Sequence, residues 1–178
     1  MARPEVTVMT RPAWILFLAT LVICAAYLAW AAGQLPDRVA SHFAADGTAD
    51  QWMSRTGFLV TFGATVGLSA LVFATIAWWM PRLPDRWFNL PRRQAWLAPE
   101  RRRRTIADIT ARLLRLGAAT NLFFLGLAHT TLVANEAAAE VPRLPAGFWV
   151  LFGVYMVLVA VWTVRFVRRF GRGPDEAN

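Results

Sequence analysis

The residues best suited to chemistry in this chain are concentrated in one polar stretch, Leu35 to Trp52. It contains His42, three aspartates and an Asp46-Gly47 dipeptide, which is typical of a tight hairpin turn. The second of the two histidines, His129, lies in a later apolar stretch. Two imidazoles and a carboxylate can bind a divalent transition metal, and histidine can act as a switch because it titrates near neutral pH. The chemistries to consider are therefore ligand binding, metal binding and a protonation switch.

Two interpretations of this stretch are open. In a structural one, Asp37 and Asp50 cap backbone amides and His42 donates a hydrogen bond to a carbonyl. In a functional one, the polar and aromatic side chains form a ligand site with a partner from the later apolar stretch. The predicted ligand-binding residues are His42, Phe43, Gly47, Asp50, Trp52 and His129. The residues that would hold a metal, if one binds, are His42, Asp50 and His129.

Catalytic signatures of other kinds are missing from the sequence. It contains no phosphate-binding loop, dinucleotide fingerprint, HExxH, CxxC or nucleophile–base–acid set. The single cysteine, Cys24, has no partner for an intrachain disulfide. No apolar run carries a row of ionisable residues suited to an ion pathway. We therefore predict a protein that is not an enzyme and needs no cofactor.

The elements that must position these residues are membrane helices. Hydrophobic residues make up 57% of the 178 residues, and the mean hydropathy is +0.40. An uncharged run of about 18 or more residues is long enough to span a bilayer core as a helix. We predict an all-α membrane protein, a single domain over residues 1–178, in which four helices form a bundle. The predicted spans are 13–32, 57–80, 116–134 and 146–164.

The arginines indicate how these helices are oriented. All 19 basic residues are arginine, and they are concentrated in the segment 81–115, whereas the loops 33–56 and 135–145 are slightly acidic. Short loops rich in basic residues stay on the cytoplasmic side. We therefore predict that both termini and segment 81–115 are cytoplasmic and that the loop 33–56, the outer loop, faces outward. His129 would then lie about 8 Å from the outer end of its span, on the same side as His42.

The basic segment 81–115 contains several prolines and aromatic residues, which predicts that it lies on the membrane surface with its aromatic side chains toward the acyl chains. Each arginine near anionic lipid contributes about 1 kcal/mol of attraction. Anionic headgroups are the predicted partners, with an acidic protein as an alternative, and nucleic acid is not predicted. After Pro99, an apolar stripe at helical spacing predicts a helix that continues into the third span. The predicted headgroup contacts are Arg101, Arg102, Arg103 and Arg104.

A face of small residues in the second span predicts close helix packing. Gly63 and Gly67 are four residues apart, and Ala70 and Ala74 continue the same face. Packing within this chain is the first interpretation, and contact with another membrane protein is the second.

The outer loop also resembles a known signature. The string LPDRVASHFAADGTADQW is similar to the outer-loop motif of a bacterial membrane-domain family of unknown function. Ala40 and Ala44 stand where that motif commonly has proline and asparagine. A second block around Asn89 to Pro91 and Trp96 to Arg102 is similar to some members. The matching outer-loop residues are Leu35, Pro36, His42, Phe43, Gly47, Asp50, Trp52 and Arg55.

This family includes the immunity proteins for the sporulation-delaying toxin, which carry additional spans. The resemblance implies a bacterial inner-membrane protein that protects against a toxic peptide and can recruit a transcriptional repressor to the membrane. We therefore expect a non-enzymatic protein that senses or binds an extracytoplasmic ligand, such as an antimicrobial peptide. The alternatives are an accessory subunit of a larger membrane complex and a metal-binding membrane protein.

Overall fold

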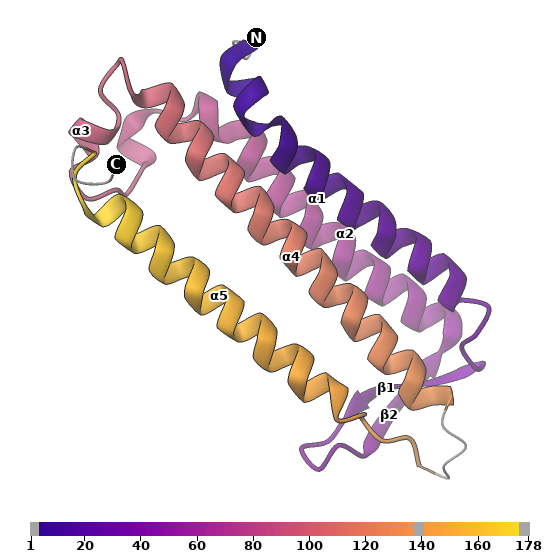
Figure 1. The fold of residues 1–178 in the computed structure, drawn as a ribbon. Helices are drawn as coiled ribbons and strands as arrows, with labels where there is room; N and C mark the ends of the chain where they lie inside the picture. Colours follow the sequence, from indigo (N-terminus) through magenta and orange to yellow (C-terminus); the bar gives the residue numbers. More distant parts are fainter. Residues whose placement is uncertain (1–3, 137–140, 175–178) are drawn as a thin grey trace.

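Four long helices form the body of the molecule in the computed structural model, which describes residues 4–136 and 141–174 (Figure 1). The four helices are α1 (Pro4–Ala31), α2 (Arg55–Trp79), α4 (Arg102–Glu136) and α5 (Gly147–Gly171). All four are long and apolar enough to cross a membrane. The prediction of an all-α, four-helix membrane protein is therefore confirmed.

The helices are longer than the predicted spans. α1 begins at Pro4, and α4 runs without a break for 35 residues from Arg102 to Glu136. The prediction that the amphipathic stretch after Pro99 continues into the third span is confirmed. Ile106 and Ile109 from its apolar stripe are buried. Of the predicted loop 135–145, residues 137–140 lie outside the described part of the chain.

α4 is the central helix of the bundle. It packs along α1 over most of its length, and it also contacts α2 and α5 (Figure 1). Gly117 lets α4 approach α1 and α2, because a Cβ at this position would lie 2.9 Å from ring atoms of both Phe17 and Phe73. Gly126 does the same toward α5, where a Cβ would lie 2.6 Å from a methyl carbon of Leu151. These two glycines therefore set the spacing of the helices.

The face of small residues on α2 is only partly used within the chain. Ala70 is buried, and Ala74 packs against the same hydrophobic cluster that contains Phe17 and Leu114. Nothing among the described residues lies within 4 Å of a Cβ built at Gly63 or Gly67. The predicted packing within the chain holds for the alanines, and the two glycines leave open space beside them.

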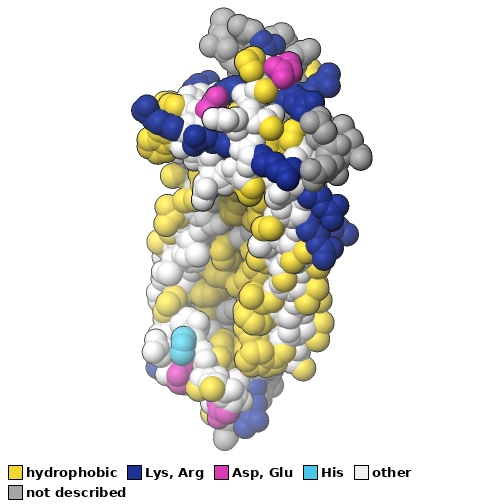
Figure 2. All heavy atoms as spheres, turned by 90° about the vertical axis from the view of Figure 1, so that its left-hand side faces the viewer, with side chains coloured by type: hydrophobic (Ala, Val, Ile, Leu, Met, Phe, Trp, Pro, Cys, Tyr) yellow, Lys and Arg dark blue, Asp and Glu magenta, His cyan; other side chains and the backbone are white. Residues whose placement is uncertain are grey.

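The face of the bundle seen in Figure 2 is largely apolar between its two ends, and many large hydrophobic side chains of the long helices are exposed, as expected for helices that contact lipid. Arginine side chains gather near the end where α3 and the start of α4 lie (Figure 2). We call this the arginine-rich end, and the opposite end, which carries the two strands, the hairpin end (Figure 1).

At the hairpin end, β1 (Arg38–Phe43) and β2 (Ala49–Ser54) form an antiparallel pair. Gly47 in the connecting turn has a φ of 80°, in the left-handed region that favours glycine. The Ser54 hydroxyl then accepts a hydrogen bond from the Gly57 amide and caps α2. The Asp46-Gly47 dipeptide is compatible with a short hairpin or with extended arms, and the paired strands show that the hairpin forms.

At the arginine-rich end, the segment between α2 and α4 folds onto the bundle through three short helices. They are η1 (Met80–Arg82), η2 (Asp85–Trp87) and α3 (Arg93–Trp96). The expectation that its aromatic side chains point to acyl chains is wrong for Phe88 and Trp96, which are buried in a cluster with Phe170. Trp96 can be buried because its indole N–H donates to the Phe170 and Arg172 carbonyls at the end of α5. Trp87 is exposed.

Candidate functional site

The hairpin presents an imidazole and a carboxylate together at its surface. His42 Nδ1 lies 2.6 Å from Asp50 Oδ1, and the two side chains are 60% and 42% exposed. An irregularity in the strand pairing brings them together, because His42 pairs with Gln51 while Phe43 pairs with Ala49. Asp50 is therefore the extra residue of a bulge, and bulges commonly redirect a side chain in this way.

An aromatic ring and a guanidinium lie on the same hairpin. The Arg38 guanidinium is placed over the Trp52 ring at 5.4 Å from its centroid. Ser54 pairs with Arg38 and Ala40 pairs with Trp52, so the two side chains are diagonal neighbours across the strands. Trp52 remains exposed, whereas Phe43 is half-buried. The hairpin thus carries polar, charged and aromatic side chains at its surface.

Asn135, near the end of α4, holds β1 against the bundle. Its side-chain oxygen accepts a hydrogen bond from the Ala40 amide at 2.7 Å, and its side-chain nitrogen donates to the Ala40 carbonyl at 3.1 Å. Ala40 is fully buried. A proline at this position could not donate the first bond, so the alanine found here suits the contact. Sequence reasoning missed Asn135, because no local pattern links it to a residue so far away in the chain.

The segment before α5 holds the other side of the hairpin. The Ala49 amide donates to the Pro142 carbonyl at 3.0 Å, and the Leu144 amide donates to the Gly47 carbonyl at 2.8 Å. Thr48 and Arg143 form an antiparallel bridge between these bonds. The two loops of this end therefore form one continuous backbone network.

An ion pair closes the base of the hairpin. Arg55 Nη2 donates to Asp37 Oδ1 at 2.7 Å, and the Arg55 amide donates to the Asp37 carbonyl at 2.9 Å. Asp37 therefore does not act as a helix cap through its side chain, as the structural interpretation expected, but joins the start of β1 to the start of α2. Ser54 supplies the cap instead.

The turn is stabilised by Asp46. Its carboxylate accepts hydrogen bonds from the Thr48 amide at 2.9 Å and the Thr48 hydroxyl at 2.6 Å. These bonds hold the pKa of the Asp46 carboxyl below its ordinary value, because they favour the ionised form. The charged turn and the left-handed Gly47 together fix the hairpin tip.

His129 has a different partner from the one expected. Its Nδ1 lies 2.9 Å from the Tyr27 hydroxyl, and the two rings meet edge to face. Within the described residues, no contact joins His129 to His42 or Asp50, and no group of three His, Cys, Asp or Glu side chains is placed to hold a metal ion. The structure therefore brings His42 and Asp50 together and places His129 in a separate pair.

Comparison with known proteins gives one partial match. Residues 19–65 match the model of a domain of unknown function, DUF1648. This region runs from the middle of α1 through the hairpin into α2, so it contains His42, Asp50 and Trp52. No curated protein and no solved structure matches the chain. The chain is thus a helical protein of membrane-spanning character that contains a domain of unknown function.

Proposed function

We propose that the protein is a non-enzymatic component of the bacterial cytoplasmic membrane whose hairpin binds a ligand outside the cell. The observation that supports this best is the exposed His42–Asp50 pair on an anchored hairpin. The hairpin is held by Asn135 of α4, by the backbone of the segment before α5 and by the ion pair at its base. Groups held in place before a ligand arrives bind it with a smaller entropic loss. An exposed pair on an anchored hairpin therefore favours recognition over a purely structural role.

The proposed ligand is a cationic, amphipathic peptide. Asp46 and Asp50 give the hairpin exposed carboxylates that attract a cationic ligand, and Trp52 gives it an exposed ring on which an apolar side chain can pack. The resemblance of the outer loop to immunity proteins against a toxic peptide supports the same ligand class.

The proposed orientation follows from the charges at the two ends. The segment 81–115 carries more of the arginines than any other segment outside the apolar spans, and short segments rich in basic residues remain in the cytoplasm. This orientation puts the hairpin end, with its carboxylates, outside. Both termini would then be cytoplasmic.

Sensitivity to membrane-active peptides tests this function. A deletion strain should become more sensitive to at least one member of a panel of cationic peptides, and the wild-type gene should restore resistance. His42→Ala and Asp50→Asn should fail to restore it at equal protein levels. Gln51→Ala, which changes an exposed neighbour on the same strand, is the matched control and should restore resistance. A deletion strain with unchanged sensitivity across the whole panel would contradict the proposal.

A second function is favoured by the open space at Gly63 and Gly67. We propose, as the alternative, that the chain is an accessory subunit whose α2 packs against another membrane protein at these glycines. A Gly67→Leu variant should then lose a partner that copurifies with the wild-type protein in mild detergent. Purification of the wild type as a uniform particle of one chain type would count against this alternative.

A further inference from the structure

A cavity of about 190 Å³ lies at the arginine-rich end, between the start of α4 and the end of α5. Its lining includes Arg101 and Arg104 from the α4 side, Arg169 from α5, and the Trp96 ring. One acidic side chain, Asp108, also lines it. The cavity is large enough for a phosphate group with bound water, since one water molecule takes about 30 Å³.

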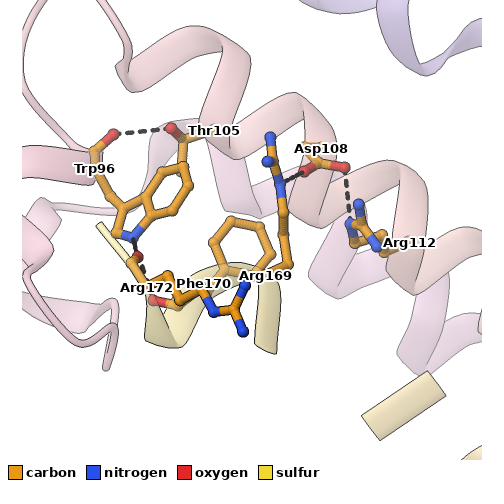
Figure 3. A network of polar contacts seen from close by, with 7 residues as sticks. All are labelled: Trp96, Thr105, Asp108, Arg112, Arg169, Phe170 and Arg172. Atoms are coloured by element: carbon orange, nitrogen blue, oxygen red, sulfur yellow. Dashed lines mark hydrogen bonds and ion pairs between the residues drawn. The ribbon is translucent and has the colours of Figure 1, made fainter. Parts of the chain in front are cut away.

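The wall of the cavity is fixed by hydrogen bonds (Figure 3). The Trp96 indole N–H donates to the carbonyls of Phe170 at 3.2 Å and Arg172 at 3.1 Å. The Thr105 hydroxyl donates to the Trp96 carbonyl at 2.8 Å. The Arg169 guanidinium lies over the Trp96 ring, 5.6 Å from its centroid. The three segments that build the cavity are therefore joined to one another without any ligand.

Among the described residues, the lining of the cavity contains more arginines than carboxylates. Asp108 is engaged by Arg112 at 2.8 Å and by Arg169 at 3.5 Å, so this single carboxylate is already shared between two arginines (Figure 3). Arg104 adds a further positive charge to the lining, and Arg101 also lines the cavity. Within the described residues, Arg104 has no hydrogen-bond or ion-pair partner, and its side chain is exposed. An anion in the cavity would therefore meet the Arg104 guanidinium, which no described residue engages.

The four consecutive arginines do not share one role. Arg102 donates to Asp85 at 2.7 Å and to the Leu83 carbonyl at 2.8 Å, which ties the segment after α2 to the start of α4. Arg101 and Arg104 line the cavity instead. The sequence predicted that Arg102 contacts lipid together with its neighbours, and its ion pair gives it a structural role as well.

The depth of the cavity points to the headgroup layer. Arg169 is five residues beyond Val164, the end of the predicted apolar span, which corresponds to about 8 Å along a helix. Headgroups add roughly 5 to 8 Å to each side of the hydrocarbon core. Guanidinium groups bind phosphate through paired N–H donors. We propose that this cavity binds a phosphate group, and its depth favours the phosphate of an anionic phospholipid as the source.

A stability measurement on the full chain tests this proposal. The protein is purified in a maltoside detergent, which contains no phosphate, and its melting temperature is followed as phosphatidylglycerol or inorganic phosphate is added. The wild type should be stabilised by phosphatidylglycerol. In Arg104→Gln the concentration that gives half of this effect should rise by about tenfold or more, as expected for the loss of a charge-assisted hydrogen bond. In Arg104→Gln/Arg169→Gln the stabilisation should be lost.

The double variant Arg165→Gln/Arg168→Gln is the matched control, because it removes the same charge from the same end of α5 without touching the lining of the cavity. It should respond to lipid as the wild type does. If inorganic phosphate also stabilises the wild type, free phosphate can occupy the cavity. If only phosphatidylglycerol stabilises it, the phosphate that binds is that of the lipid headgroup. Equal loss in the control, or no stabilisation of the wild type by either compound, overturns the proposal. Arg104→Gln alone decides the matter if the Arg169 variant does not fold.

Discussion

Asn135 is the residue that does most to place the hairpin on the bundle. Its amide makes two hydrogen bonds with the backbone of Ala40 and one with the Thr131 carbonyl of its own helix. Ala40 is buried, so truncation of Asn135 would leave the Ala40 amide and carbonyl without these partners in a buried position. A buried backbone group without a partner costs about 1–3 kcal/mol.

We therefore predict that Asn135→Ala loosens the hairpin without unfolding the helices. Amide hydrogen exchange at β1 should become faster, while exchange in the middle of α4 should not change. Thr131→Ala is the control, because the Thr131 hydroxyl donates to the Leu127 carbonyl of its own helix and bonds to no other described residue. Unchanged exchange at β1 in Asn135→Ala would show that the amide contact does not hold the hairpin.

Asp46 provides a prediction about pH. Hydrogen bonds from Thr48 hold its carboxyl pKa below the ordinary value of 3.8. A carboxyl whose folded pKa is depressed stabilises the fold above its unfolded pKa and loses this contribution as the pH falls through the folded value. The hairpin tip should therefore weaken only below about pH 3.8. In Thr48→Ala, the Asp46 pKa should rise toward its ordinary value, as measured by a carboxyl NMR titration.

The control for this titration is Ser41→Ala, which removes a hydroxyl from the same hairpin that does not touch Asp46. The Asp46 pKa should stay where it is in that variant. An Asp46 pKa that is identical in the wild type and in Thr48→Ala would rule out the hydrogen bond as the cause.

At the residue scale, sequence reasoning reached only what local spacing determines. His42 and Asp50 are eight residues apart on either side of an Asp-Gly turn, so their proximity follows from the hairpin. His129 contacts Tyr27 and Ala40 contacts Asn135, and the members of each pair are distant in sequence. Both contacts depend on which face of α4 is turned toward the rest of the bundle. No period in the sequence specifies that rotation.

At the scale of elements, the glycines have different roles. Gly117 faces the rings of Phe17 and Phe73, and Gly126 faces Leu151, whereas Gly63 and Gly67 face open space. In the sequence, Gly63 and Gly67 stand out because they are four residues apart. Spacing alone cannot identify the helix that a glycine contacts, so the pair that sets the packing distances was missed. The existence of the four helices was predictable, because membrane-spanning length needs only a local apolar run.

We predict that Gly117→Ala destabilises the bundle and Gly63→Ala does not. The added methyl group at residue 117 would overlap two aromatic rings, and overpacking of this kind costs about 1–3 kcal/mol. The same methyl group at residue 63 meets nothing within 4 Å among the described residues. Thermal unfolding in one detergent compares the two variants directly. Equal melting temperatures for both would contradict the helix spacing described here.

At the scale of the whole molecule, the two ends differ in charge and construction. One end carries an anchored hairpin with exposed carboxylates, and the other carries arginines around a cavity and a buried tryptophan. The asymmetry of the arginines was visible in the sequence. The cavity was not, because it joins Arg104 to Arg169, which lie on different helices.

The proposed orientation predicts which end can be reached from outside the cell. A Gln34→Cys variant should react with a membrane-impermeant maleimide in intact spheroplasts, and Arg86→Cys should react only after the membrane is opened. Both positions are exposed. The natural Cys24 is fully buried, so it should give little background. The reverse labelling pattern would mean that the hairpin is cytoplasmic.

The attachment of α5 has a mechanical consequence. Between its ends, α5 packs mainly against one helix, α4. Just before α5 begins, the chain is bonded to the hairpin through Pro142 and Leu144, and where α5 ends, its carbonyls are bonded to Trp96. A membrane helix changes its tilt when bilayer thickness changes. Tilting of α5 would therefore exert force on the hairpin and on the Trp96 wall at the same time, which makes the two ends mechanically coupled through this one helix.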